Sequence, residues 1–269
     1  MSTTSAKVDI RSQDVVGFEA LIRWCDDRGA IQAPSDFVGL AIELGLIDPI
    51  TQFVTTEAVN ALEQLDDAFG AGTTMSINVA AKQAGDLKFM RGFAQALADT
   101  QRAHRFMLEL TEDAFLQKSR FQLHVLPMLR EIGVRVSIDD FGTGYSSLSA
   151  LADITADEIK VDRSFITAIH QRPRSQSVLK TIESLSDALG MTVIAEGVET
   201  FEELAYLQAA TRIRYAQGYY FAKPFFLDDF KETRRVAPDV RTVSMSRERF
   251  ETRGDRSARV ATHALGRRE

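Results

Sequence analysis

The stretch VRVSIDDFGTG (residues 134–144) sets the pattern from which the fold can be inferred. Its aliphatic and β-branched residues are typical of a buried strand, and a glycine-rich loop follows. Between strand and loop stand two adjacent carboxylates, Asp139 and Asp140. Like charges at such close range disfavour ionisation, so this arrangement needs a chemical explanation.

Six further runs of the same character occur along the chain. They are VVGFEALIRW (15–24), MSINVA (75–80), RFMLELTE (105–112), EIKVD (158–162), MTVIAEGVE (191–199) and IRYAQGYYF (213–221). From residue 75 onward the runs begin about 30 residues apart, which is the length of a strand–helix unit. Strands that alternate with helices predict a parallel sheet, and this many units favour an α/β, TIM-like (β/α)8 barrel over an open sheet.

The segments between the runs predict helices. Residues 174–190 place Val178, Ile182, Leu185 and Leu189 at helical spacing, with Gly190 as the C-cap. Residues 121–133 end at Gly133 in the same way, and Pro127 should kink that helix or mark its first turn.

Composition excludes several classes of protein. The 269 residues are 45% hydrophobic with a net charge of -6, which is ordinary for a globular chain and argues against a coat for a nucleic-acid polymer. One cysteine, Cys25, excludes an internal disulfide and suits the cytoplasm. No signal peptide is found, and the apolar stretch 37–54 carries acids, glycines and a proline, so no membrane segment is expected.

The end of the chain differs from the rest. Residues 231–269 hold 11 basic and 6 acidic residues and few aliphatics. We therefore expect a barrel domain over residues 1–235 and a basic extension over 236–269. A solvated extension is favoured over an arm that binds a partner.

Polar side chains collect where the predicted strands end. They are Glu19, Asn78, Glu109, Glu112, Asp139, Asp140, Lys160, Asp162, Glu196, Glu199 and Gln217. Strand ends converge in a barrel, and carboxylates so crowded need cations in order to stay ionised. Oxygen ligands select Mg²⁺, Mn²⁺ or Ca²⁺ over Zn²⁺. One aspartate of the Asp139–Asp140 pair could bridge two metals while the other holds the second, as in phosphodiester chemistry.

Single residues also have structural interpretations. Glu112 and Glu199 could be surface acids. Asp162 is better explained structurally, as a salt-bridge partner of Lys160 or as a helix N-cap, than as a catalytic group. Tyr219 and Tyr220 are more typical of a core than of a stacking platform. Lys160 taken alone would more often be solvated, although beside a phosphoryl group it could neutralise charge.

The ordered motifs resemble the EAL domain of bacterial cyclic di-GMP phosphodiesterases. The motifs are Glu19-Ala20-Leu21 within GFEALIRW, then SINVA, ELTE, DDFGTGYSSL, EIKVDRSFI, IAEGVET and QGYYFAKP, across roughly residues 8–230. The resemblance implies a barrel of the EAL type that opens cyclic di-GMP to linear pGpG with two Mg²⁺ or Mn²⁺ ions, with Ca²⁺ inhibitory. It also implies a homodimer and leaves room for a regulatory protein partner.

The resemblance also implies residue roles. The first metal would be held by Glu19, Asn78, Glu109 and Asp139, and the second by Asp139 and Asp140. Glu196 matches the general base or the residue that orders the attacking water, with Lys160 and Gln217 beside that water. Leu21, Ile22 and Arg23 would contact the substrate. The residues that would support the site are Glu112, Glu199, Phe141, Gly142, Thr143 and Gly144.

One departure concerns the start of the barrel. The family has a Tyr-Gln-Pro-like segment before the glutamate triplet, in a first strand whose glutamine touches the substrate. AKVDIRSQDVVGFEAL keeps only the end of that segment, so a truncated first strand is expected.

Three hypotheses about activity follow. The first is an active phosphodiesterase. The second is a catalytically weak or inactive module of the same fold that binds cyclic di-GMP or a protein partner, which the first-strand departure supports. The third is an unrelated metal-dependent barrel, such as a lyase acting on small acids, in which Arg23→Ala would have no effect.

Overall fold

The computed structural model describes residues 1–111, 120–142 and 155–226, and all of these belong to one compact unit. The predicted extension, residues 236–269, lies outside the described residues, so its boundary stays a prediction.

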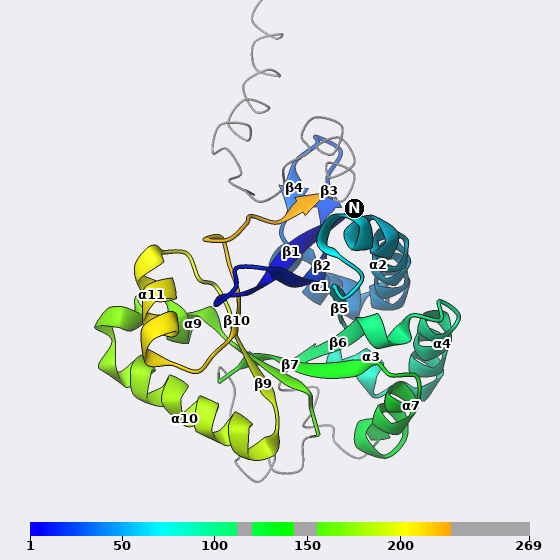
Figure 1. Cartoon of the computed structure of the whole chain (residues 1–269). Helices are drawn as coiled ribbons and strands as arrows, with labels where there is room; N and C mark the ends of the chain where they lie inside the picture. Colours follow the sequence, from blue (N-terminus) through cyan, green and yellow to red (C-terminus); the bar gives the residue numbers. More distant parts are fainter. Residues whose placement is uncertain (112–119, 143–154, 227–269) are drawn as a thin grey trace, which may run out of the picture. The chain divides into compact units, whose positions relative to one another are not determined.

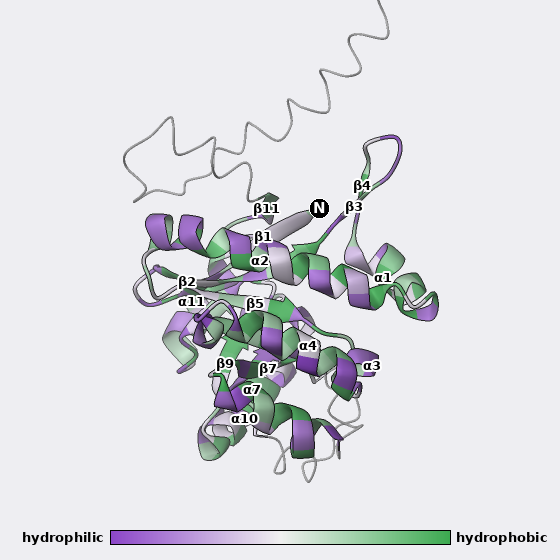
Figure 2. Ribbon diagram, turned by 90° about the vertical axis from the view of Figure 1, so that its right-hand side faces the viewer, coloured by the Kyte–Doolittle hydropathy of each residue, from purple (hydrophilic) through white to green (hydrophobic). Residues whose placement is uncertain are grey.

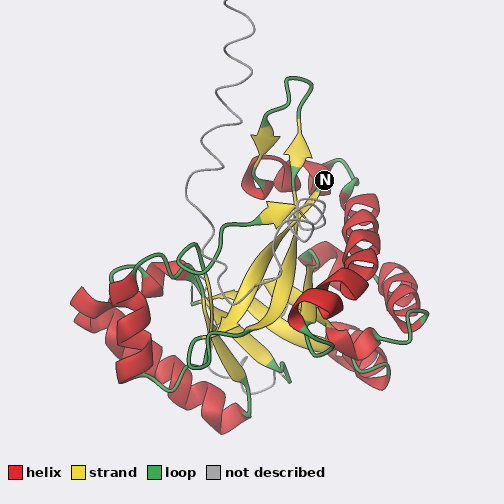
Figure 3. Cartoon of the chain, turned by 45° about the horizontal axis from the view of Figure 1, so that its top comes forward, coloured by secondary structure: helices red, strands yellow, loops and turns green. Residues whose placement is uncertain are grey.

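A closed barrel of eight strands forms the centre of this unit, with helices around it (Figures 1 and 3). The barrel strands are β1 (Ser2–Asp9), β2 (Val15–Ile22), β5 (Thr74–Asn78), β6 (Phe106–Thr111), β7 (Arg135–Phe141), β8 (Glu158–Val161), β9 (Thr192–Ala195) and β10 (Tyr215–Gln217). They are neighbours in this order, and β10 pairs with β1 to close the barrel. The predicted TIM-like barrel is confirmed.

Strand β1 is the first strand of the barrel, and it is held by pairing on both sides. It pairs antiparallel with β2, from Ser2 opposite Ile22 to Val8 opposite Val15, and antiparallel with β10 through Lys7, Val8 and Asp9. All eight of its residues are buried. Main-chain pairing of these eight residues therefore closes the barrel without the side chains of the Tyr-Gln-Pro-like segment.

The helices that cover the barrel each follow a strand or a short connection. They are α1 (Pro34–Glu43), α2 (Ile47–Phe69), α3 (Ala81–Ala84), α4 (Leu87–Ala98), α7 (Leu126–Glu131), α9 (Arg163–Ile166), α10 (Pro173–Leu189) and α11 (Phe201–Ala210), with shorter turns η1 (Ala103–Arg105), η2 (Phe121–Val125) and η3 (Ile169–Gln171). Figure 2 shows that hydrophobic and hydrophilic residues alternate along them, as expected when one face packs on a sheet. Two short pairings remain: β11 (Phe225–Phe226) joins β1, and β3 (Trp24–Cys25) pairs with β4 (Ile31–Gln32).

Two helix predictions made from the sequence are confirmed. Helix α10 ends at Gly190, whose φ of 70° provides the left-handed C-cap. Pro127 lies in the first turn of α7, directly after the π-helical turn η2. Among the described helices, none has the length and apolar character that crossing a bilayer requires.

Gly197, which follows Glu196, offers a test of the packing around the strand ends. Its φ is +67°, and an added Cβ would lie 2.3 Å from Arg163 Cβ. We expect Gly197→Ala to lower the free energy of unfolding by about 2–4 kcal/mol, through left-handed strain and overpacking together. Gly29 is the matched control, because its φ is +80° but nothing lies within 4 Å of an added Cβ. Gly29→Ala should cost only about 1 kcal/mol in urea unfolding, and equal losses would contradict the packing argument.

Candidate active site

The ammonium of Lys160 lies at the centre of a cluster of carboxylates. Its Nζ is 2.7 Å from Glu109, 2.8 Å from Glu196, 3.0 Å from Asp139 and 3.2 Å from Glu19. These four acids come from the ends of β6, β9, β7 and β2, and Lys160 itself is on β8. The lysine side chain is 1% exposed, so the interpretation of Lys160 as a solvated surface residue is wrong.

Two amides complete the inner surface of the cluster. Asn78 Nδ2 donates to Glu19 Oε1 at 2.7 Å, and Gln217 Nε2 donates to Glu19 Oε2 at 2.8 Å. Glu19 is therefore oriented from both sides. The donation from Asn78 leaves its amide oxygen as the group that can bind a cation.

An irregularity in β7 explains the adjacent aspartates. Along a regular strand, neighbouring side chains point to opposite faces. The pairing of β7 with β8 shifts between Ile138 and Phe141, and Asp140 has a left-handed φ of 53°. Both carboxylates consequently reach the same end of the barrel, where Asp139, Asp140 and Glu196 offer oxygens within 4.8 Å of one another. Aspartate is among the residues that tolerate this conformation best.

The crowding of charge changes the pKa values of the cluster. Burial raises the pKa of Glu109 and of Glu196 to about 8 each, against the opposing attraction of Lys160. For Glu19, burial alone would raise the pKa, but Lys160, Asn78 and Gln217 together hold it below the ordinary value. Burial and the neighbouring Asp139 raise the pKa of Asp140. Burial opposes the charge of Lys160, yet its acidic partners raise its pKa well above the usual value.

The donor set fits hard divalent cations. Two triads of carboxylates with oxygens within 4.8 Å share Asp139, and they are Glu19–Glu109–Asp139 and Asp139–Asp140–Glu196. Within the described part of the chain, the buried oxygens Glu109 Oε1 and Gln217 Oε1 have no hydrogen-bond partner. Unpartnered buried oxygens are costly, and a cation would satisfy them. The second triad adds Glu196 to the pair of ligands expected from the sequence.

Arg23 lies at the rim of this cluster, next to Leu21 and Ile22 at the end of β2. Its Nη1 donates to the carbonyl oxygen of Ile22 at 2.8 Å. Burial lowers its pKa, while Tyr219 and Glu19 act in the opposite direction, which places the tyrosine and the catalytic cluster within electrostatic range of the guanidinium.

The aromatic side chains near Arg23 were not recognised from the sequence. Tyr219 is 59% exposed and Tyr220 is 40% exposed, so their assignment to the core is wrong. Trp24, which follows Arg23 directly, is 54% exposed and packs edge-on against Phe37. Their position in the sequence could have identified them. Trp24 follows Arg23 directly, and the two tyrosines follow Gln217 after one glycine.

Several predicted supporting residues lie elsewhere or outside the described residues. Glu199 is exposed, and its main-chain N–H donates to the Glu203 carboxylate at 2.9 Å. Asp162 is the N-cap of α9, which is one of its two structural interpretations. Phe141 is buried, and an added Cβ on Gly142 would lie 2.8 Å from the Phe165 ring. Glu112, Thr143 and Gly144 fall outside the described residues.

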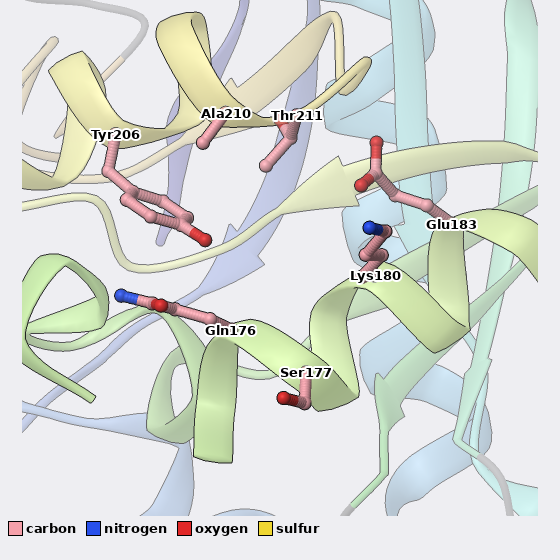
Figure 4. Close-up of a pocket in the computed structure, with 7 residues that line it drawn as sticks. All are labelled: Gln176, Ser177, Lys180, Glu183, Tyr206, Ala210 and Thr211. Carbon is pink, nitrogen blue, oxygen red and sulfur yellow. The ribbon is translucent and has the colours of Figure 1, made fainter. Parts of the chain in front are cut away.

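A separate hollow of about 280 Å³ lies between α10 and α11 (Figure 4). It is lined by Gln176, Ser177, Lys180, Glu183, Tyr206, Ala210 and Thr211. Ser177 Oγ donates to the carbonyl of Pro173, and Glu183 accepts from the main-chain N–H of Arg212. These groups serve local helix and loop contacts, and no predicted site residue lines the hollow.

Comparison with known proteins identifies the family of the chain. A family model described as "EAL domain" matches residues 6–224. The cyclic di-GMP phosphodiesterase PdeR of Escherichia coli K12 is 36% identical over 212 residues, which cover 78% of this chain and 32% of PdeR. The chain thus spans about a third of the length of this relative.

Solved structures agree with this assignment. The EAL enzyme Bd1971, in its form bound to cAMP and cyclic di-GMP, superposes with a TM-score of 0.80 at 28% identity, covering 87% of this chain and 64% of that one. The PaMucR phosphodiesterase in complex with c-di-GMP gives a TM-score of 0.78 at 30% identity, covering 85% and 93%. The chain belongs to the EAL domain family.

The pKa shifts predict how pH affects the stability of the metal-free protein. Glu109 and Glu196 titrate at about 8 in the folded chain, above the ordinary value of 4.5. Between pH 4.5 and 8 the folded state keeps protons that the unfolded state has lost. The two groups therefore contribute their full stabilisation of the folded state below pH 4.5, and this contribution is lost as the pH rises towards 8. The lowered pKa of Glu19 affects the stability of the folded state only at pH values below this range.

We therefore expect the melting temperature in chelator to fall by several degrees between pH 5 and pH 8.5. Glu109→Gln should flatten this dependence, because the amide does not ionise. Mn²⁺ should raise the melting temperature most at high pH, where it replaces protons among the carboxylates. A melting temperature that increases steadily towards pH 8.5 in chelator would contradict the assignment.

Proposed function

We propose that this chain is a metal-dependent phosphodiesterase that hydrolyses cyclic di-GMP to linear pGpG in bacterial second-messenger signalling. The observation that carries the proposal is the pair of carboxylate triads that share Asp139, with Lys160 among them and Arg23 at their rim. Membership of the EAL family and the name of PdeR support the same substrate.

The ligand set follows from the geometry of the strand ends. Glu19, Asn78, Glu109 and Asp139 would hold one Mg²⁺ or Mn²⁺, and Asp139 with Asp140 a second, with Glu196 in reach of the second triad. When bound, two such ions supply Lewis acidity at the phosphoryl group and orient attack on it.

The protein's own groups account for the proton and the charge. Water adds to phosphorus, the P–O3′ bond breaks, the leaving 3′ oxygen takes a proton from solvent, and the linear dinucleotide leaves with a 5′-phosphate and a free 3′-hydroxyl. Glu196 is placed to take the proton of the water, because its carboxylate lies within 4.8 Å of oxygens of Asp139 and Asp140. Lys160, fully charged, can stabilise the negative charge that develops on the phosphoryl oxygens.

The rim suits a nucleotide. Arg23 offers a guanidinium for a phosphate, and guanidinium groups bind phosphate through paired hydrogen bonds. The exposed rings of Trp24 and Tyr219 offer surfaces on which a purine base can stack. A phosphate contact beside aromatic rings favours a nucleotide over a small acid as substrate.

The other hypotheses are weaker. The main support for a non-catalytic binding module was an incomplete first strand, whereas β1 supplies eight buried residues that pair with β2 and β10. The ligand-bearing strand ends also keep their full set of acids. An unrelated barrel acting on small acids is inconsistent with membership of the EAL family.

The proposal predicts a metal-dependent product. Purified protein incubated with cyclic di-GMP and Mg²⁺ or Mn²⁺ should form pGpG, detected by chromatography, and no pGpG should form in chelator. Glu196→Gln should lower kcat by at least about 10²-fold, because the amide cannot accept the proton of the water. Binding of cyclic di-GMP by the wild type without turnover would instead identify a receptor.

Arg23 gives a second test. We expect Arg23→Ala to raise KM for cyclic di-GMP by about 10-fold to 100-fold with kcat changed much less, because a hydrogen bond to a charged group is worth about 1.5–3 kcal/mol. Arg28, exposed in the turn between β3 and β4, provides the matched control. Equal KM values for Arg23→Ala and Arg28→Ala would remove Arg23 from the substrate site.

The effect of Ca²⁺, the site of action in the cell and the assembly of the protein are further predictions. Ca²⁺ should inhibit, because its longer bonds and larger number of ligands distort a site built for Mg²⁺. The cytoplasm as site of action, a homodimer and a regulatory protein partner are part of the same proposal, and sedimentation tests the dimer.

A further inference from the structure

A second buried ion pair lies inside the barrel beside the catalytic cluster. Lys7 Nζ on β1 is 2.6 Å from Glu158 Oε1 on β8, and the two side chains are 5% and 7% exposed. Ser137 Oγ on β7 donates to the same carboxylate oxygen at 3.1 Å. None of these three residues has a role in the proposed reaction.

The pair is close to the catalytic groups in the sheet. Glu158 precedes Lys160 by two residues on β8, so both side chains point into the barrel. Ser137 lies opposite both Glu158 and Glu109 in the register of the sheet, and Lys7 lies opposite Gln217. The charge of Lys7 also acts on Glu109.

Glu158 is a competitor for the catalytic lysine. A buried carboxylate without a cationic partner is unfavourable, so Glu158 needs one. The ammonium of Lys160 is the nearest alternative on the same strand, because two residues of strand advance only about 6.6 Å. A lysine side chain can span such a separation by changing its rotamers.

We propose that Lys7 is a positioning residue: by pairing with Glu158 it leaves Lys160 free to stay among the four carboxylates of the active site. The kinetic consequences rest on the proposed phosphodiesterase function, whereas the location of Lys160 does not. Lys7 does not touch the reacting atoms. It acts through Glu158 on the place that Lys160 takes.

The test uses Lys7→Met, Lys7→Arg and the double variant Lys7→Met/Glu158→Gln. Lys7→Met should lower kcat at least tenfold with KM changed less than threefold, because Lys160 is drawn to Glu158. Lys7→Arg should keep most of the activity, since it keeps the charge. The double variant should regain most of kcat, because the neutral amide at position 158 no longer attracts Lys160.

A merely structural role for the pair would give a different pattern. Melting temperatures would then follow the loss of the ion pair, and kcat of the folded fraction would stay at the wild-type value in every variant. That result, or a double variant as slow as Lys7→Met, would overturn the proposal. Lys7→Gln, which keeps a hydrogen-bond donor without the charge, replaces Lys7→Met if that variant does not fold.

A crystal structure of the metal-free Lys7→Met variant separates this proposal from the proposed function. Lys160 Nζ within hydrogen-bond distance of Glu158 supports the positioning role even if the wild type makes no pGpG. Lys160 Nζ still among Glu19, Glu109, Asp139 and Glu196 overturns it, whatever the activity of the wild type.

Discussion

The burial of one ammonium among four carboxylates is the interaction on which the active end of this barrel depends. Lys160 Nζ lies within 3.2 Å of acids from four other strand ends, which are drawn together although they repel one another. Neither partner could be buried alone at acceptable cost. The lysine and the acids therefore make each other's position possible, and the same crowding produces the raised pKa values that suit proton transfer and cation binding.

The barrel wall supports this cluster with two local devices. The irregularity in β7 brings Asp139 and Asp140 to one end, so that a single strand serves both carboxylate triads. The antiparallel strand β1 closes the barrel and brings Lys7 to Glu158. Charge inside the barrel is thereby divided into two groups, one around Lys160 and one formed by Lys7 and Glu158.

In this barrel the residues that fill the interior are different from those that form the candidate site. Most barrel positions only fill the interior, and Ile77, Leu108, Ile138 and Ile159 are fully buried apolar residues of the strands. Chemistry is confined to the ends of those strands, where loops can vary without disturbing the core. Trp24 and Tyr219 are exposed there, and Arg23 lies within electrostatic range of Tyr219 and Glu19.

The sequence by itself determined the strand–helix alternation, the barrel and the strand ends that carry acids, because hydrophobic periodicity and turn residues are local signals. It also determined the C-cap role of Gly190, which depends on a few neighbouring residues, whereas the structure decided that Asp162 is an N-cap. Only the tertiary structure decided which acids meet. Lys160 and Glu19 are 141 residues apart, and Lys7 and Glu158 are 151 apart, so no local pattern contains these pairs. The exposure of Tyr219 and the closure of the barrel by β1 likewise depend on which strand packs beside which.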